Sequence, residues 1–338
     1  MSFRANMTVA CPPTISVLIP AYQAARFVGA AIESALAQHP APHEVLVCND
    51  GSTDDTLAAI RRYQPQVIAL SQPNGGEASA RNTLWRAASG DYVAYLDADD
   101  IYLPGRLDAV LRLLADEPSI DIVTTDAFLM LEGQPVGRRY EGEQRFAETD
   151  QRKAILRGNF IFGHAVVRRS LLESVGGFDE DIRYATDWET WIRLILAGGR
   201  AALVPEPLAE YRLHASAMSV HRLRMSDGRV RTLAKTLDRS DLHDDERGML
   251  QRSLAAERVR NDREHFLAGL SSGTSSLRNL ASRIARSHEQ PRRVRLLATV
   301  AALSPRVARI LNGRSDRSVV RGPGDRPIPR HAAPGPRA

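Results

Sequence analysis

The stretch from Gly90 to Asp100 reads GDYVAYLDADD, an apolar run that passes directly into three carboxylates. Tyr92–Leu96 is short and continuously apolar, which is typical of a buried strand. Asp97, Asp99 and Asp100 follow within four residues. Like charges set this close together repel, so a cation or another partner must offset them. The stretch therefore predicts a buried strand that ends in a charged functional or capping loop.

The chain on both sides of this stretch alternates apolar runs with helix-like segments. This alternation predicts an α/β fold with a largely parallel central sheet up to about residue 220. Strands are expected at 15–19, 45–48, 67–70, 92–96, 121–131 and 165–167, and helices at 25–38, 56–63, 77–88, 104–115, 151–157 and 188–196.

Several polar residues are expected at one edge of that sheet. Asp50 directly follows one strand and Asp97 follows another, and ligands of open α/β sheets bind beyond the carboxyl ends of the strands. Asp97 and Asp99 offer hard oxygens of the kind that hold Mg²⁺ or Mn²⁺ against a diphosphate. The alternative reading of Asp97–Asp100 is an acidic helix-capping loop. Asn74-Gly75-Gly76 and Arg81 could add backbone amides and a cation.

Other chemistries are excluded by motif or composition. No GxGxxG follows the first strand and no GxxxxGK[ST] occurs, so the dinucleotide fingerprint and the P-loop are absent. Two cysteines, Cys11 and Cys48, are too few for a disulfide framework, which predicts a reducing compartment. No apolar run approaches the length of a membrane span and the first residues do not read as a secretion signal, so we expect a chain that is neither membrane-spanning nor secreted.

Charge divides the chain into an acidic body and a basic C-terminal region. Residues 221–338 hold 25 Lys+Arg and 12 Asp+Glu, whereas residues 1–220 hold 20 and 28. We expect an N-terminal tail at 1–13, the α/β domain at 14–220, basic amphipathic helices at 221–312 and a disordered Pro/Gly/Arg tail at 313–338.

Taken together, seven ordered motifs resemble the family two glycosyltransferases, which have the GT-A fold. They are Ile19-Pro20-Ala21-Tyr22, Asn49-Asp50-Gly51-Ser52, Asn74-Gly75-Gly76 with Ala80-Arg81-Asn82, Gly90-Asp91-Tyr92 with Leu96-Asp97-Ala98-Asp99-Asp100, Gly176-Gly177-Phe178-Asp179, Thr186-Asp187-Trp188-Glu189-Thr190-Trp191 with Arg193, and Tyr211-Arg212-Leu213-His214. The resemblance covers about residues 14–220. It implies a GT-A-type, Rossmann-like nucleotide-sugar domain and an inverting transfer of sugar from a nucleoside diphosphate.

The resemblance also implies roles for particular residues. Asp50 would read the base of the nucleotide, and Asp99 would coordinate Mn²⁺ or Mg²⁺, with His214 closing over the metal or diphosphate. Asp100 is expected to be a helix cap. The expected nucleotide-sugar-binding residues are Pro20, Ala21, Tyr22, Asp50, Asn74, Gly75, Arg81, Asp97 and Ala98.

Asp187 is the expected general base, because inverting transfer needs a carboxylate that takes the proton of the acceptor hydroxyl. The alternative reading of Asp187 is a helix N-cap. Thr186 departs from the acidic residue usual in the family, and Glu189 is a poorer substitute base. His164 has no motif support. Trp188 and Trp191 could stack on an acceptor sugar, although core packing is the expected role of at least one of them.

The predicted function is metal-dependent transfer of a sugar, with a UDP-sugar as expected donor, to the hydroxyl of a glycan, a lipid-linked glycan or a small molecule. The alternatives are a sugar nucleotidyltransferase and a binding protein that has lost turnover. The segment 292–311 mixes arginine with leucine, valine and isoleucine, which suits peripheral contact with anionic lipid. Packing on the catalytic domain or in a dimer is the competing account. We expect no nucleic-acid partner and a cytoplasmic location, peripheral on the inner face of the membrane if the lipid contact holds.

Overall fold

The computed structural model describes residues 12–142, 145–214, 221–272 and 277–313, with the short pairs 320–321 and 327–328. The chain divides into two compact units. The first comprises the residues up to Ile155 with Asn159–Arg212, and the second comprises Leu156–Gly158 with the residues from Leu213 onward. The expected tails at 1–13 and 313–338 fall almost wholly outside the described residues.

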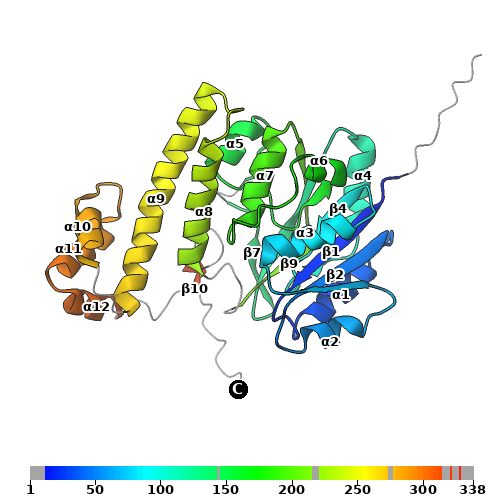
Figure 1. The fold of residues 1–338 in the computed structure, drawn as a ribbon, viewed down its shortest axis with the longest axis horizontal. Helices are drawn as coiled ribbons and strands as arrows, with labels where there is room; N and C mark the ends of the chain where they lie inside the picture. The colour runs from blue at the N-terminus through cyan, green and yellow to red at the C-terminus, as the bar shows by residue number, and fades with distance from the viewer. Residues whose placement is uncertain are drawn as a thin grey trace, which may run out of the picture. The chain divides into compact units, whose positions relative to one another are not determined.

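The first unit, coloured blue to green in Figure 1, is built on one mixed sheet. The strand order of this sheet is β3-β2-β1-β4-β8-β6-β9-β5, with β7 paired to β6. Its strands are β1 (Ile15–Ala21), β2 (Glu44–Asp50), β3 (Ile68–Gln72), β4 (Tyr92–Tyr95), β5 (Ile101–Tyr102), β6 (Ile122–Leu131), β7 (Gln134–Arg138), β8 (Val166–Arg168) and β9 (Ala201–Leu213). The strands β3, β2, β1 and β4 run parallel, whereas β8 pairs antiparallel with both β4 and β6. The predicted α/β class with a parallel central sheet is confirmed.

The helices of this unit are α1 (Val28–Leu36), α2 (Thr56–Arg61), α3 (Glu77–Ala87), α4 (Arg106–Asp116), α5 (Gln151–Arg157), α6 (Arg169–Ser174) and α7 (Thr186–Leu196). The core forms where the fully buried Val17, Ile19 and Val47 of the parallel strands meet Val28 and Ile32 of α1. Parallel strands buried on both faces read as continuous apolar runs, which is why this part of the sheet could be seen in the sequence.

The parallel register places the ends of β1, β2 and β4 at one edge of the sheet. Leu18 pairs with both Leu46 and Tyr95, so the three strands end within a few residues of one another. The turns after β2 and β4, which carry Asp50 and Asp97, therefore share this edge.

The second unit is helical, apart from the short pair β10 (Val320–Arg321) and β11 (Pro327–Ile328). Its helices are α8 (Arg222–Leu237), α9 (Asp244–Ser272), α10 (Leu277–Arg286), α11 (Arg292–Leu303) and α12 (Pro305–Gly313). Its core joins Phe266 and Leu270 of α9 to Ile284 of α10 and Ala298 of α11. Within the described residues, no helix combines the length and apolar character needed to cross a membrane.

Candidate active site

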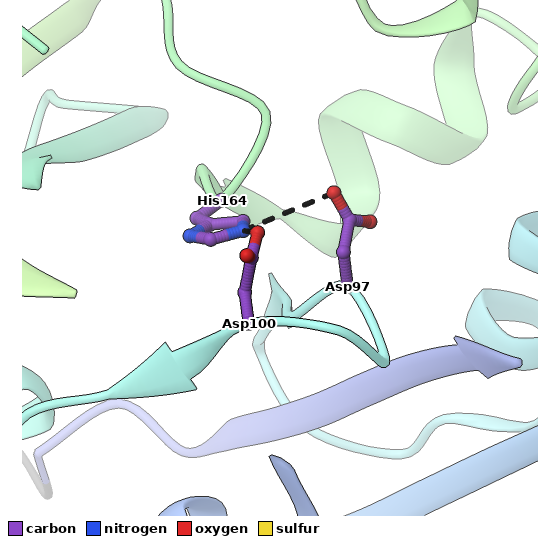
Figure 2. Close-up of side chains that lie close together, drawn as sticks. All are labelled: Asp97, Asp100 and His164. Carbon is purple, nitrogen blue, oxygen red and sulfur yellow. Dashed lines mark hydrogen bonds and ion pairs between the residues drawn. The ribbon is translucent and has the colours of Figure 1, made fainter. Parts of the chain in front are cut away.

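The acidic turn after β4 is closed by its own backbone and packed against His164. The amide of Asp100 donates to the carbonyl oxygen of Asp97 at 3.0 Å. Figure 2 shows both carboxylates near the His164 ring: Asp100 Oδ2 lies 2.7 Å from Nε2, and Asp97 Oδ2 lies 3.8 Å from the same nitrogen. Two carboxylates and an imidazole at this spacing could hold a divalent cation.

Asp100 was expected to cap a helix, and that prediction was wrong. The two-residue strand β5 follows it, and α4 begins only at Arg106. The Asp100 carboxylate is buried, accepting from the His164 ring through Oδ2 and from the backbone amide of Arg212 through Oδ1 at 2.7 Å. Burial raises the pKa of Asp100 to about 6, and the nearby His164 opposes that rise. Asp100 therefore holds the turn together from inside.

His164 and Arg212 support this turn, and the sequence reading assigned neither of them to it. The His164 ring is buried among the rings of Tyr102, Phe162 and Tyr211. The Arg212 guanidinium donates to the backbone carbonyl oxygens of Asp99 and Asp100. Arg212 lies in the quoted Tyr-Arg-Leu-His motif, so a signal for it existed. Nothing around His164 in the sequence marked it.

Arg81 is a buried cation between two carboxylates. Its Nη2 lies 2.7 Å from Glu77 and 3.0 Å from Asp97 Oδ1, and its guanidinium lies over the rings of Tyr95 and Phe178. Burial would raise the pKa of Asp97, but Arg81 and His164 outweigh it, so the pKa of Asp97 is lowered. Arg81 thereby keeps Asp97 ionised, while 30% of the Asp97 side chain stays exposed.

Asp187 lies in the first turn of α7, close to the Arg81 guanidinium. Ala185 occupies the N-cap position, so the alternative reading of Asp187 as the N-cap does not hold. Asn159 donates to Asp187 Oδ2 at 3.0 Å. Burial raises the pKa of Asp187, and Arg81 offsets only part of that rise. A carboxylate with a raised pKa is a stronger proton acceptor once ionised.

Three neighbouring side chains of α7, those of Trp188, Glu189 and Trp191, are buried in the protein interior. Glu189 is buried and forms a two-point ion pair with Arg193, with both contacts at 2.7 Å, so it is unsuited to act as a substitute base. Trp188 and Trp191 are only 3% and 0% exposed. Both tryptophans are therefore core residues in this structure, and neither offers a face to a sugar.

Asp50 organises the turn that precedes α3. Its Oδ1 accepts from the Gly75 amide and the Gln72 side chain, both at 2.8 Å, and its Oδ2 accepts from the Gly76 amide at 2.9 Å. The Asn74 side chain donates to the Asp50 carbonyl oxygen. Gly76 has a φ of +87°, a conformation in which other residues are strained. The structure thus brings Asp50, Asn74 and Gly75 together, and the predicted base contact of Asp50 stays a prediction.

The other predicted site residues lie at the same sheet edge or just outside the first unit. Pro20 and Ala21 end β1, and the side chain of Tyr22 beyond them is 54% exposed. Ala98 is buried and Asp99 is half-buried. His214 follows β9 and belongs to the second unit, so its predicted role beside Asp99 stays a prediction.

The carboxylates of this edge fit a divalent cation. Asp97 and Asp99 are the two partly exposed carboxylates of one turn, and their oxygens are ligands that Mg²⁺ and Mn²⁺ prefer. The Asp100 carboxylate is already engaged by His164 Nε2 and by the Arg212 amide, so this pair is better suited to support the turn than to bind the cation directly.

Comparison with known proteins agrees with the fold and the motifs. Residues 16–176 match the family described as glycosyl transferase family 2. The chondroitin synthase of Pasteurella multocida strain Pm70 is 33% identical over 190 residues, which are 55% of this chain and 19% of that protein. The succinoglycan biosynthesis protein ExoU of Rhizobium meliloti is 28% identical over 216 residues, 59% of this chain and 61% of that one. The chain thus spans less than two thirds of these relatives.

Solved structures share the architecture. S. aureus TarS residues 1–349 in complex with UDP-GlcNAc aligns with a TM-score of 0.60 at 18% identity, covering 89% of each chain. The mannosyltransferase PcManGT of Pyrobaculum calidifontis, in complex with GDP-Man and Mn²⁺, gives 0.54 at 20% identity, covering 91% of this chain and 89% of that one. The fold is that of GT-A glycosyltransferases. The match over residues 16–176 and the ordered motifs make the chain similar to glycosyl transferase family 2.

Proposed function

We propose that this protein transfers a sugar from a nucleoside diphosphate sugar, with a UDP-sugar as the expected donor, to a hydroxyl group. One observation carries the proposal: the acidic turn Asp97–Asp100 lies at the carboxyl edge of the parallel strands, and the buried Arg81 keeps Asp97 ionised there. This edge is where α/β sheets bind nucleotides. The donor complexes of the structurally similar TarS and PcManGT support the same class of ligand.

A divalent cation, Mn²⁺ or Mg²⁺, completes the proposed donor site. When bound, such a cation offsets the negative charge that develops on the departing nucleoside diphosphate. Asp99 is the proposed ligand from this chain. Asp97 is proposed to lie beside the ribose or the donor sugar. The Asp100–His164 pair and the Arg212 guanidinium hold the backbone of this turn in place.

The proposed general base is Asp187. The acceptor oxygen attacks the anomeric carbon of the donor sugar, the bond from that carbon to the diphosphate oxygen breaks, and the hydroxyl proton passes to the Asp187 carboxylate. Attack opposite the leaving group inverts the anomeric carbon. Asn159, which donates to Oδ2, fixes the orientation of the carboxylate.

The acceptor is proposed to be a saccharide of a cell-envelope polysaccharide, either free or carried on a lipid. The names of the relatives support this class, since they include a chondroitin synthase and a succinoglycan biosynthesis protein. A cytoplasmic location, at the inner face of the membrane for a lipid-carried acceptor, is part of the same proposal.

The test is a screen of UDP-, dTDP- and GDP-sugars, each with Mn²⁺ or with chelator, read by thermal shift and by release of the nucleoside diphosphate. One donor should raise the melting temperature only with metal and should release its diphosphate when an acceptor is added. The variant Asp99→Ala should lose the metal effect, whereas Asp116→Ala, an exposed carboxylate at the end of α4, should retain it. If Mn²⁺ still strengthens UDP binding in Asp99→Ala, the metal assignment is wrong.

A further inference from the structure

The helices α11 and α12 expose four large apolar side chains to solvent. Leu296 is 69% exposed, Leu303 80%, and Val307 and Leu311 48% each. These are four of the six exposed large hydrophobic side chains found among the described residues. On α11, at about 100° per residue, Leu296 and Leu303 lie about 20° apart on one face. We call these four side chains the leucine face.

The leucine face lies on helices whose other sides are well packed. Ala298 and Ala301 lie on the opposite side of α11 from Leu296 and Leu303, and both are fully buried, as is Ala308 of α12. They pack in a core with Phe266 of α9 and Ile284 of α10. The helices α10 to α12 therefore already have an interior, and the leucine face is a second apolar surface left over once that core is complete.

The segment that carries this face is positively charged. Residues 277–313 contain eight arginines, one glutamate and no lysine or aspartate, a net charge of +7. Arg292 lies one turn before Leu296 on the same side of α11, and Arg293 is also exposed. Neither arginine has a hydrogen-bond or ion-pair partner in the part of the chain that the structure describes. Their charges are therefore available to an external anion.

Exposed apolar side chains beside exposed arginines fit a surface that is both apolar and anionic. A bilayer with anionic headgroups offers both properties within a few ångströms of depth. Nucleic acid would offer phosphates without an apolar layer, and a second copy of this chain would bring the same positive charge to the interface.

We propose that the leucine face and its arginines dock this protein on an anionic lipid bilayer, with α11 lying in the plane of the headgroups. Leu296 and Leu303 enter the boundary of the acyl chains, and Arg292 and Arg293 contact the lipid phosphates. The inference goes beyond the proposed transferase function and is independent of it, because it involves none of the residues placed in the candidate active site.

The experiment is co-sedimentation of the full chain with vesicles of equal parts phosphatidylglycerol and phosphatidylcholine, compared with vesicles of phosphatidylcholine alone. Binding to the anionic vesicles should be stronger by about tenfold or more and should weaken as salt is added. The double variant Leu296→Ser/Leu303→Ser should lower the affinity by about tenfold or more. The matched control is Ile68→Ser, which removes a 44% exposed side chain of β3 and should bind like the parent.

Three results would overturn the proposal. The first is failure of the parent chain to sediment with anionic vesicles. The second is full binding by the double variant, since binding would then come from another part of the chain. The third combines two observations: the parent chain does not bind vesicles, and light scattering shows that its oligomeric state changes when the two leucines are replaced. The leucine face would then join copies of this chain. Circular dichroism of each variant confirms that the helices are intact.

Discussion

The replacement Asp50→Asn tests what the first strand-end carboxylate does. In the structure the two oxygens of Asp50 accept three hydrogen bonds, from the amides of Gly75 and Gly76 and from the side chain of Gln72. Asparagine has nearly the same shape but only one acceptor oxygen, and its other polar atom is an NH₂ donor. Whichever way the amide turns, that NH₂ must face at least one N–H group that now has no acceptor.

The expected loss of stability follows from these contacts. A hydrogen bond to a charged group contributes about 1.5–3 kcal/mol, and a buried donor left without a partner costs about 1–3 kcal/mol. The two terms overlap because the same N–H group is involved in both. Asp50 is only 3% exposed, so water has little access to replace the lost acceptor. We therefore expect the free energy of unfolding to fall by about 2–4 kcal/mol.

The assay is urea unfolding followed by the fluorescence of the three tryptophans. The matched control is Asp55→Asn, which makes the same change in charge at an exposed residue whose side chain forms no cap hydrogen bond. It should change stability by less than about 0.5 kcal/mol. If Asp50→Asn is as stable as this control, the carboxylate does not hold the glycine turn and the reasoning is refuted. UDP affinity measured on the folded variant then reports the predicted base contact separately.

Three further outcomes are expected. Asp187→Asn should lower kcat by about 10²–10⁴ with little change in donor affinity. In the parent protein, kcat/KM should rise with pH through a pKa above the ordinary aspartate value, because only the ionised carboxylate accepts a proton. A variant with near-parental kcat would exclude Asp187 as the base. Asn82→Ala removes the hydrogen-bond partner of the Phe178 amide, of the Phe178 carbonyl and of the Trp85 indole N–H. The free energy of unfolding in urea should fall by about 3–5 kcal/mol. A loss below about 1 kcal/mol would contradict this assignment. Burial raises the pKa of the Cys48 thiol to about 12. In a Cys11→Ser background, a thiol reagent should therefore label Cys48 only after the chain unfolds. Rapid labelling of the folded chain would show that the thiol is accessible and would contradict this prediction.

The central part of the fold could be predicted because its signal is local. Buried parallel strands appear as short apolar runs, and the polar residues that follow them must lie at the same edge of the sheet. This reasoning located Asp50 and Asp97 correctly. The short strand β5 and the long β9 were missed, since β9 mixes prolines and glutamates with its apolar residues and has no clean alternation.

The support of the acidic turn could not be predicted because it depends on contacts between distant residues. His164 lies 64 residues from its partner Asp100, and Arg212 lies 112 residues from it. A single buried histidine or an arginine at the end of a strand has no periodic pattern to mark it. The error over Asp100 has the same origin, since an aspartate shortly before the helix expected at 104–115 resembles a cap until its long-range partners are known.

The carboxylates of the site carry more negative charge than the one buried arginine among them can offset. Glu77, Asp97 and Asp187 surround one buried cation, Arg81, so the carboxylates outnumber the positive charge that faces them. Burial raises the pKa values of both Glu77 and Asp187, and Arg81 compensates only in part. A divalent cation on the neighbouring turn would favour the ionised forms of all three carboxylates, including the form of Asp187 that accepts a proton. The metal proposed for the donor would thus also prepare the base for the acceptor.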